Sequence, residues 1–346
     1  MAGTWSVAAK HADAVSLMKG LQYNFGKEVK FISAKGANID YSEKLENIYA
    51  AHGKLTDRDN RPKEVLLKEA VDVANKADVI VLAIGESAEM SGESSSRAEI
   101  DIPQSQIDLL KELKKTGKPI AVVLFTGRPL ALTNMKDIPD AILNVWFSGT
   151  EAGNAISDVL FGKVNPSGKL PITFPRSLGQ IPIYYNHKNT GRPLSQEKTD
   201  KCEYERFRSN YMDECNTPLY PFGYGLSYTK FNYSPMSVSD SSPKGNQTIQ
   251  ASVTVTNSGN YDVAEVVQLY IRDMVGSITR PVKELKGFQK VFLKKGESKK
   301  VTFNISPEDL KFYNNALKFD WEAGEFDVMI GTSSDDVQHT KINWSK

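Results

Sequence analysis

The sequence has few of the residues that build metal sites. It contains two cysteines, Cys202 and Cys215, and four histidines scattered along 346 residues. Two cysteines do not make a zinc pattern and no cofactor motif is present, so we expect neither a metal nor another cofactor. The two cysteines lie close together in a polar segment. They can form a disulfide in an oxidising compartment, and two free thiols are the alternative.

The sequence also lacks an excess of either charge, since 43 Lys and Arg residues balance 42 Asp and Glu residues. This balance predicts no binding to nucleic acid or to an anionic membrane surface. No apolar run is as long as a membrane-spanning helix. The N-terminal segment has no basic start followed by an apolar core, and we therefore expect no signal peptide there.

Phosphate-binding and serine-nucleophile motifs are absent as well. The stretch Gly85–Gly92 is not a G-x-G-x-x-G fingerprint, and neither a P-loop nor a G-x-S-x-G elbow occurs. A nucleotide- or flavin-binding protein therefore remains an alternative that only the expected sheet topology permits.

The first half of the chain alternates between helical and strand patterns. Helical spacing covers 12–25, 65–77, 105–117 and 151–162, and strand patterns cover 28–36, 78–85, 119–127, 141–149 and 169–175. This order predicts an α/β domain over residues 1–215 with a doubly wound, mostly parallel sheet. Because such domains usually begin with a strand and this chain begins with a helix, we expect the first strand of the domain to be missing.

The second half changes in composition. Proline, glycine and aromatic residues dominate 176–228, and such a density of aromatics predicts a segment packed on a surface. From residue 231 to 346, short alternating strands separated by turn signals predict an all-β sandwich. We expect an aromatic linker, 216–230, to join the two domains.

A long loop with four glutamates follows the strand pattern at 78–85, namely Glu86, Glu89, Glu93 and Glu99. Ligands of open α/β sheets bind at the carboxyl ends of strands, where this loop begins. Glu93 follows a glycine, which allows close approach of a ligand, and in a low-dielectric pocket it would serve as a general acid. The alternative is a solvated loop acid. Arg97 can pair with one of the acids or bind a hydroxyl group.

Four longer motifs carry a resemblance to a known family: Trp146–Ser177, Tyr184–Pro193, Pro218–Thr229 and Arg280–Glu297. They resemble glycoside hydrolase family three, above all its bacterial β-glucosidases of the periplasmic type. The resemblance implies a catalytic barrel, an α/β sandwich and a fibronectin type III-like sandwich, in that order. Only the last two match this sequence, so we expect it to lack the N-terminal barrel.

The resemblance also implies a retaining mechanism that hydrolyses terminal β-D-glucosyl residues with two carboxyl groups. The barrel supplies the nucleophile, an Asp in a Ser-Asp-Trp motif, and the second domain supplies an acid/base Glu in a Gly/Ser-Glu-x-x-x-Arg context. The run SGESSSR places Glu93 in that role and implies that Ser91 and Arg97 bind substrate. Many members have Asp before the Arg where this chain has Ser96, which leaves Glu89 as a second candidate.

These implications predict an incomplete enzyme that is inactive alone, with a β-glucoside substrate and the missing barrel as its partners. The full-length family implies a periplasmic or secreted location, whereas the sequence predicts no oligomeric state. The competing hypothesis is a non-catalytic carbohydrate-binding or interaction module, in which aromatic residues between Tyr184 and Tyr228 stack on sugar rings.

Overall fold

The computed structural model describes residues 3–6, 8–49, 57–194 and 202–346. The chain forms two compact units, one of Met1–Val164 with Pro175–Gly179 and the other of Asn165–Phe174 with Gln180–Lys346. The units divide the chain at other points than the expected limits of 1–215, 216–230 and 231–346. Most of the aromatic-rich segment belongs to the second unit because it packs there.

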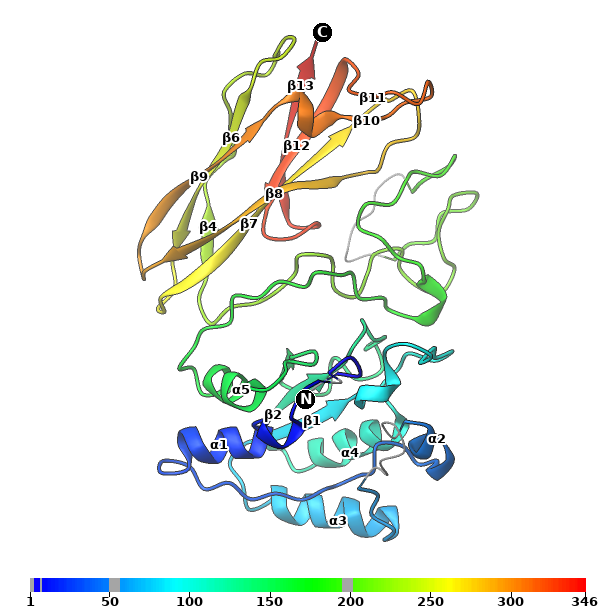
Figure 1. Ribbon diagram of the computed structural model, residues 1–346, viewed down its shortest axis with the longest axis vertical. Coiled ribbons are helices and arrows are strands. Elements are labelled where there is room, and N and C mark those ends of the chain that lie inside the picture. Colours follow the sequence, from blue (N-terminus) through cyan, green and yellow to red (C-terminus); the bar gives the residue numbers. More distant parts are fainter. Residues whose placement is uncertain (1–2, 7, 50–56, 195–201) are drawn as a thin grey trace. The chain divides into compact units, whose positions relative to one another are not determined.

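The first unit contains a parallel sheet of three strands in the order β1-β2-β3 (Figure 1). The strands are β1 (Ile80–Gly85), β2 (Ile120–Phe125) and β3 (Ala141–Asn144). In β2, Val122, Val123 and Leu124 have no exposed surface, as expected for an apolar strand covered on both faces. The expected α/β architecture with a parallel sheet is therefore confirmed.

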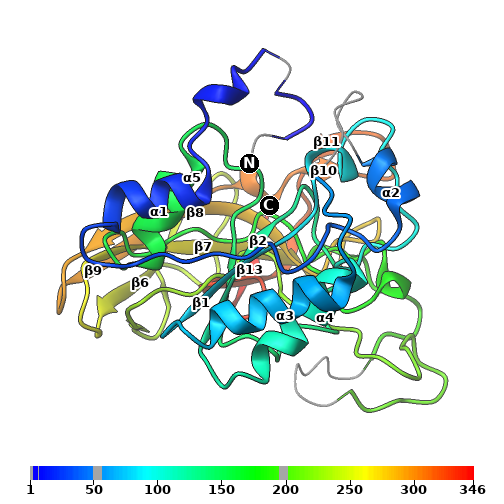
Figure 2. The same cartoon turned by 90° about the horizontal axis from the view of Figure 1, so that it is seen from below.

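Helices cover both faces of this sheet, and Figures 1 and 2 show them in two pairs, α1 beside α5 and α3 beside α4. Their bounds are α1 (Leu17–Phe25), α3 (Lys63–Ala74), α4 (Gln104–Lys114) and α5 (Ala152–Leu160). Leu17 and Ile156 of the first pair pack against Val123 of β2. The two helices of this pair approach so closely that a Cβ atom on Gly20 would lie 2.2 Å from the backbone of Gly153.

One expectation for the first unit was wrong, and one helix of this unit was not predicted. Residues 28–36 join no sheet, and Phe31 of this segment packs edge-on against Phe161 at the end of α5, with ring centroids 6.0 Å apart. The polar stretch after them contains a short helix that the sequence did not predict, α2 (Glu43–Ile48). Its buried Glu46 forms an ion pair with Arg58.

The second unit is an antiparallel β-sandwich, which confirms the expected fibronectin type III-like fold (Figure 1). One sheet has the order β13-β12-β7-β8, and the other has the order β4-β6-β5 with β9 paired to β6. The strands are β4 (Phe231–Tyr233), β5 (Ser237–Val238), β6 (Ile249–Asn257), β7 (Val263–Asp273), β8 (Glu284–Leu293), β9 (Ser298–Ile305), β12 (Gly324–Gly331) and β13 (Val337–Trp344), beside the small pair β10 (Phe312–Tyr313) and β11 (Phe319–Asp320). Val255, Val267 and Trp344 lie in the core between the sheets with no exposed surface.

The aromatic-rich segment packs on this sandwich, as its composition predicted. Tyr185 stacks on Phe222 with ring centroids 4.3 Å apart and meets Tyr270 of β7 edge-on at 5.9 Å. The strand expected at 169–175 was wrong, because this segment forms no part of the parallel sheet. Its single bridge joins Phe174 to Tyr220 within the second unit.

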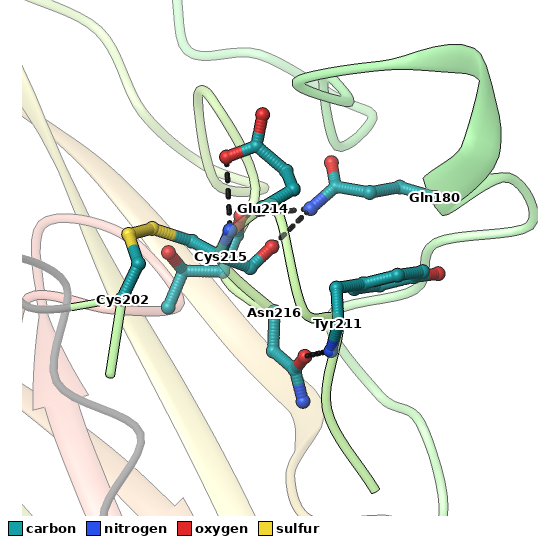
Figure 3. Close-up of a disulfide and its surroundings, with 7 residues drawn as sticks. Gln180, Cys202, Tyr211, Glu214, Cys215 and Asn216 are labelled. Atoms are coloured by element: carbon teal, nitrogen blue, oxygen red, sulfur yellow. Dashed lines mark hydrogen bonds between the residues drawn. A yellow bond between two sulfur atoms is a disulfide. The ribbon is translucent and has the colours of Figure 1, made fainter. Parts of the chain in front are cut away.

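Cys202 and Cys215 form a disulfide in the second unit, with Cα atoms 4.7 Å apart (Figure 3). The side-chain amide of Gln180 donates hydrogen bonds to the carbonyls of Cys215 at 2.6 Å and Thr217 at 3.2 Å. The disulfide thus lies beside a backbone that other contacts already hold in place. Among the helices of the described residues, none is long and apolar enough to cross a membrane.

Candidate functional site

The candidate site lies in the loop between β1 and α4, at the carboxyl ends of the parallel strands. The backbone amide of Glu86, the first loop residue, donates to the carbonyl of Phe125 at the end of β2, at 2.8 Å. The loop then forms one short turn, η3 (Ala88–Met90), before it reaches Glu93. This is the edge of an open α/β sheet at which ligands bind.

Glu86 is buried at this edge, and its side chain has no exposed surface. Its Oε1 accepts a hydrogen bond from Nη1 of Arg97 at 2.9 Å and lies 3.1 Å from Nε of Arg128, in an ion pair without hydrogen-bond alignment. Its Oε2 accepts from the hydroxyl of Thr126 at 3.0 Å and from the amide of Gly127 at 3.2 Å. We call Glu86, Arg97, Thr126 and Arg128 the Glu86 cluster. Because both oxygens have partners, Glu86 is poorly placed to give a proton to a ligand.

Glu93 has the opposite environment, since its side chain is exposed. Its neighbours adopt unusual backbone angles, with φ of +145° at Gly92 and +57° at Ser94. Within the ranges that the structure describes, the Glu93 carboxyl group has neither an ion-pair nor a hydrogen-bond partner. A carboxyl group that is to protonate a ligand must be accessible in this way.

The loop backbone on both sides of Glu93 is held by side chains from outside the loop. Nη2 of Arg128 donates to the carbonyls of Met90 and, at 2.9 Å, of Ser95. The hydroxyl of Thr4 contacts the carbonyl of Ser91 at 2.8 Å. The segment that contains Glu93 therefore lies between fixed points.

The other residues predicted from the sequence lie on the same loop. Ser91 is half-buried, and a Cβ atom on Gly127 would come within 2.4 Å of its hydroxyl oxygen, so the glycine permits this contact. The guanidinium of Arg97 points to Glu86 and also donates to the carbonyl of Asp101 at 3.2 Å. Glu89 is half-buried in η3.

Burial has an electrostatic effect at the end of the loop. It raises the pKa of Asp101, and the negative charge of Glu99 adds to this effect, while Arg97 opposes it. The Glu93 and Glu86 carboxyl groups thus share their loop with Asp101, whose charged form is disfavoured.

A cavity of about 270 Å³ opens beside the ends of β1 and β2, and Gly85, Gln106 and Phe147 are among its lining residues. Gln106 is buried there, and its amide pairs with the backbone N–H and C=O of Gly85 at 2.7 Å and 3.0 Å. Glu93 is not a lining residue. The described residues contain no group of three or more His, Cys, Asp or Glu that could hold a metal ion.

Sequence reasoning missed the part of the site that follows β2 and β3. Thr126 and Arg128 come directly after β2, and Trp146, with φ of +51°, comes just after β3. The sequence did contain a signal for these residues. The carboxyl ends of parallel strands meet at one edge of the sheet, so the residues that follow each strand are all candidates for the site.

Comparison with known families and proteins identifies the origin of this arrangement. Residues 1–228 match the model of the glycosyl hydrolase family 3 C-terminal domain, and residues 265–334 match that of the fibronectin type III-like domain. The chain is 49% identical to a periplasmic β-glucosidase of Salmonella typhimurium over 96% of its own length and 43% of that relative. It is 39% identical to a putative β-xylosidase of Formosa agariphila, over 92% of the chain and 40% of the relative.

Solved structures agree with this result. A β-glucosidase from Listeria innocua in complex with glucose superimposes with a TM-score of 0.85 at 38% identity, over 99% of this chain and 44% of that one. The chain thus spans less than half the length of the relatives that it matches. It belongs to glycosyl hydrolase family 3, of which it carries the C-terminal domain and the fibronectin type III-like domain.

Proposed function

We propose that this chain is part of a retaining β-glucosidase that hydrolyses terminal β-D-glucosyl residues of oligosaccharides or glucosides in the periplasm or outside the cell. The relatives named β-glucosidases support the reaction, and the periplasmic relative from Salmonella supports the location. One structural observation supports the assignment of the acid. Glu93 presents an exposed carboxyl group between the two carbonyls that Arg128 binds, whereas Glu86 is buried and fully paired and Glu99, which is also exposed, lies beyond that part of the loop.

In the proposed reaction, Glu93 gives its proton to the glycosidic oxygen while a second carboxylate attacks the anomeric carbon. The aglycone leaves with that proton, and a glycosyl-enzyme intermediate remains. Glu93, now ionised, then takes a proton from the water molecule that hydrolyses the intermediate. A retaining enzyme needs its two carboxyl groups about 5 Å apart. We assign the nucleophile to the barrel that the family resemblance implies, so the 346 residues alone are expected to be inactive.

Ser91 and Arg97 are proposed to form walls of the substrate site on either side of Glu93. The Ser91 hydroxyl lies in the half-buried part of the loop, where it can reach a sugar hydroxyl. Arg97 already uses two of its donors on Glu86 and Asp101, so only its remaining N–H groups are free to meet a ligand.

The test joins this chain to the N-terminal part of the Salmonella relative that precedes the matched region, and we call the product the joined enzyme. We expect the joined enzyme, but not the chain alone, to hydrolyse 4-nitrophenyl β-glucoside, and to do so faster than the β-xyloside. Glu93→Gln should lower kcat/KM for an alkyl β-glucoside by roughly 10²–10⁴-fold, the usual contribution of a general acid.

Glu89→Gln and Glu99→Gln are the matched controls, because they remove acids of the same loop. The assignment of Glu93 fails if Glu89→Gln causes the large loss and Glu93→Gln does not. The proposed dependence on a barrel fails if the isolated chain hydrolyses the aryl glucoside and Glu93→Gln abolishes that activity.

A second candidate function is carbohydrate binding without catalysis, and one feature of the second unit favours it. A cavity of about 940 Å³ is lined by aromatic and planar polar side chains, including Tyr184, Tyr185, Asn189 and Asp327. Tyr184 is 60% exposed, so its ring is available for stacking on a sugar.

Titration of the isolated chain with oligosaccharides tests this alternative. Binding that is lost in Tyr184→Ala and unchanged in Glu93→Gln would support a binding module. Absence of binding by the chain, together with activity of the joined enzyme, would favour the hydrolase.

A further inference from the structure

We propose that the Glu86 cluster positions the carboxyl group of Glu93, with Glu86 and Arg128 as positioning residues that fix the backbone of residues 90–97. This inference rests on the proposed function for its catalytic consequence, but its structural part can be tested on the chain alone. The cluster does not touch the reacting atoms, and it acts through the loop that carries Glu93.

The backbone around Glu93 needs support from outside. Ser94 adopts a left-handed conformation with φ of +57°, which costs a residue with a side chain about 1–2 kcal/mol. Gly92 adopts φ of +145°, and a Cβ atom there would lie 3.0 Å from the hydroxyl oxygen of Thr4. Strained conformations of this kind persist only where surrounding contacts determine them. A loop without such contacts would relax and move the carboxyl group of Glu93.

Arg128 provides contacts on both sides of the strained segment. The same terminal nitrogen, Nη2, donates to the carbonyl of Met90 before Glu93 and to that of Ser95 after it. The charge of Glu86, whose Oε1 lies 3.1 Å from Nε of Arg128 in an ion pair, keeps the guanidinium near the loop, where both bonds form. Loss of the Glu86 charge would therefore release Arg128 and, with it, both carbonyls.

Arg97 connects the far end of the loop to the same carboxylate. Its side chain is 13% exposed, and its guanidinium spans Glu86 and the carbonyl of Asp101. Glu86 itself is held at the sheet by Thr126 and by the amide of Gly127, both of which follow β2. One buried carboxylate thus links the start, the middle and the end of the loop to the ends of the strands.

A buried ionised carboxylate is stable only where its charge and hydrogen-bonding capacity are satisfied. The arginine donors that satisfy Glu86 come from the loop itself and from the residues after β2. Departure of the loop from this conformation would leave the buried charge of Glu86 with fewer partners, so a single loop conformation is favoured.

The first test measures hydrogen exchange on the 346-residue chain. Glu86→Gln keeps the shape of the side chain but removes its charge. Arg128→Lys keeps a positive charge but removes the hydrogen bonds to the carbonyls of Met90 and Ser95. We expect amide exchange in residues 91–97 to accelerate by about tenfold or more in both variants, as for the loss of charged hydrogen bonds. Exchange in β2 and α4 should stay unchanged, and Glu112→Gln, on the exposed face of α4, is the matched control.

A uniform acceleration across the first unit would mean that the cluster only stabilises the fold, and would overturn the proposal. Equal exchange in wild type and both variants would overturn it as well. If Glu86→Gln does not fold, Arg128→Lys alone decides the question, because it leaves the buried carboxylate charged and paired with Arg97.

The second test uses the joined enzyme and the dependence of kcat/KM on the leaving group. A displaced general acid slows substrates with poor leaving groups and spares those with good ones. Arg128→Lys should therefore lower kcat/KM about tenfold for an alkyl glucoside and by little for 2,4-dinitrophenyl β-glucoside. A merely structural role would lower both equally, which would contradict the positioning role.

The two tests separate this proposal from the proposed function. If Glu93→Gln shows no leaving-group dependence while loop exchange still accelerates in Arg128→Lys, Glu93 is not the acid and only the structural part of the inference stands. If Glu93→Gln shows that dependence and Arg128→Lys does not, the acid is correctly assigned and the positioning role fails.

Discussion

Glu86 in the α/β unit and Glu265 in the sandwich are both buried beside cationic side chains. The two glutamates differ in the parts of the structure to which these side chains also bind. Glu86 in the α/β unit is paired with Arg97 and Arg128. Glu265 of β7 in the sandwich, 3% exposed, lies 3.1 Å from Nζ of Lys169 and 3.4 Å from the hydroxyl of Tyr233. Both follow the rule that a buried charge needs a partner.

The difference lies in where those partners come from. The arginines around Glu86 belong to loops and extend to loop carbonyls, so the cluster determines a local conformation. Tyr233 belongs to β4, and Lys169 also donates to the carbonyl of Gly225 at 3.0 Å, so Glu265 ties segments of the sandwich together. The same chemistry therefore sets loop geometry in one unit and overall stability in the other.

The largest effect is expected in the sandwich. Lys169→Met leaves Glu265 buried without its cationic partner, which should lower the free energy of unfolding by about 3–5 kcal/mol. Urea unfolding followed by the fluorescence of Trp321 and Trp344, both in the sandwich core, measures this change. All proteins in this experiment carry Phe in place of Trp5 and Trp146, so that only Trp321 and Trp344 contribute to the tryptophan fluorescence.

The control for this prediction is Lys341→Met, which removes an exposed partner of Glu325 in the same sandwich and should cost under about 1 kcal/mol. Adding Glu265→Gln to Lys169→Met should recover part of the loss. If Lys169→Met lowers the free energy of unfolding no more than the control does, the Lys169–Glu265 pair does not stabilise the sandwich, and Glu265 does not have the role described above.

A smaller effect concerns pH. Burial raises the pKa of Glu265, although Lys169 and Tyr233 oppose this. The folded protein thus binds this proton more tightly than the unfolded chain does. The contribution of Glu265 to stability is therefore complete below the ordinary carboxyl pKa of about 4.3, and it is lost as the pH rises through the raised pKa. Glu265→Gln should flatten this fall in a pH series of sandwich unfolding.

Asp140 in the α/β unit should behave with the opposite sign. The backbone amide of Ile120, and after it Lys114, lowers the pKa of Asp140. Its contribution is present above the ordinary aspartate pKa and is lost as the pH falls through the lowered pKa. Asp140→Asn should reduce the acid sensitivity of this unit, and an identical acid transition in both proteins would contradict the expectation.

The smallest effect concerns the strained loop. Ser94→Gly removes the cost of a left-handed residue but adds freedom to the unfolded chain, so we expect a gain in stability of up to about 1 kcal/mol. Amide exchange at residues 91–97 reports the change locally. Faster exchange in Ser94→Gly would show that the Glu86 cluster does not support a strained backbone.

Much of the fold was predictable because apolar runs and periodicity mark buried strands and amphipathic helices. The predictions failed for segments whose structure depends on their spatial neighbours, which a local sequence pattern does not reveal. Residues 28–36 have the composition of a strand but no neighbouring strand, and the segment 169–175, up to Phe174, belongs to the second unit. The helix at Glu43–Ile48 is too short for periodicity to reveal.

The site was predictable in part, since local sequence placed Glu93, Ser91 and Arg97 on one strand-end loop. The partners of Glu86 were not predictable, because Thr126 and Arg128 lie some forty residues away and are brought close only by the pairing of β1 with β2. Local sequence therefore indicated the exposed acid, whereas the buried cluster that supports its loop required the structure.

The most direct test of the account is product analysis of Glu93→Ala in the joined enzyme, with 2,4-dinitrophenyl β-glucoside and azide. This substrate needs no acid to form the glycosyl intermediate, and without the base of Glu93 the intermediate should react with azide in place of water. We predict faster turnover with azide and β-glucosyl azide, of retained configuration, as the product. Turnover that azide does not accelerate, with glucose as the only sugar product, would contradict the assignment of Glu93.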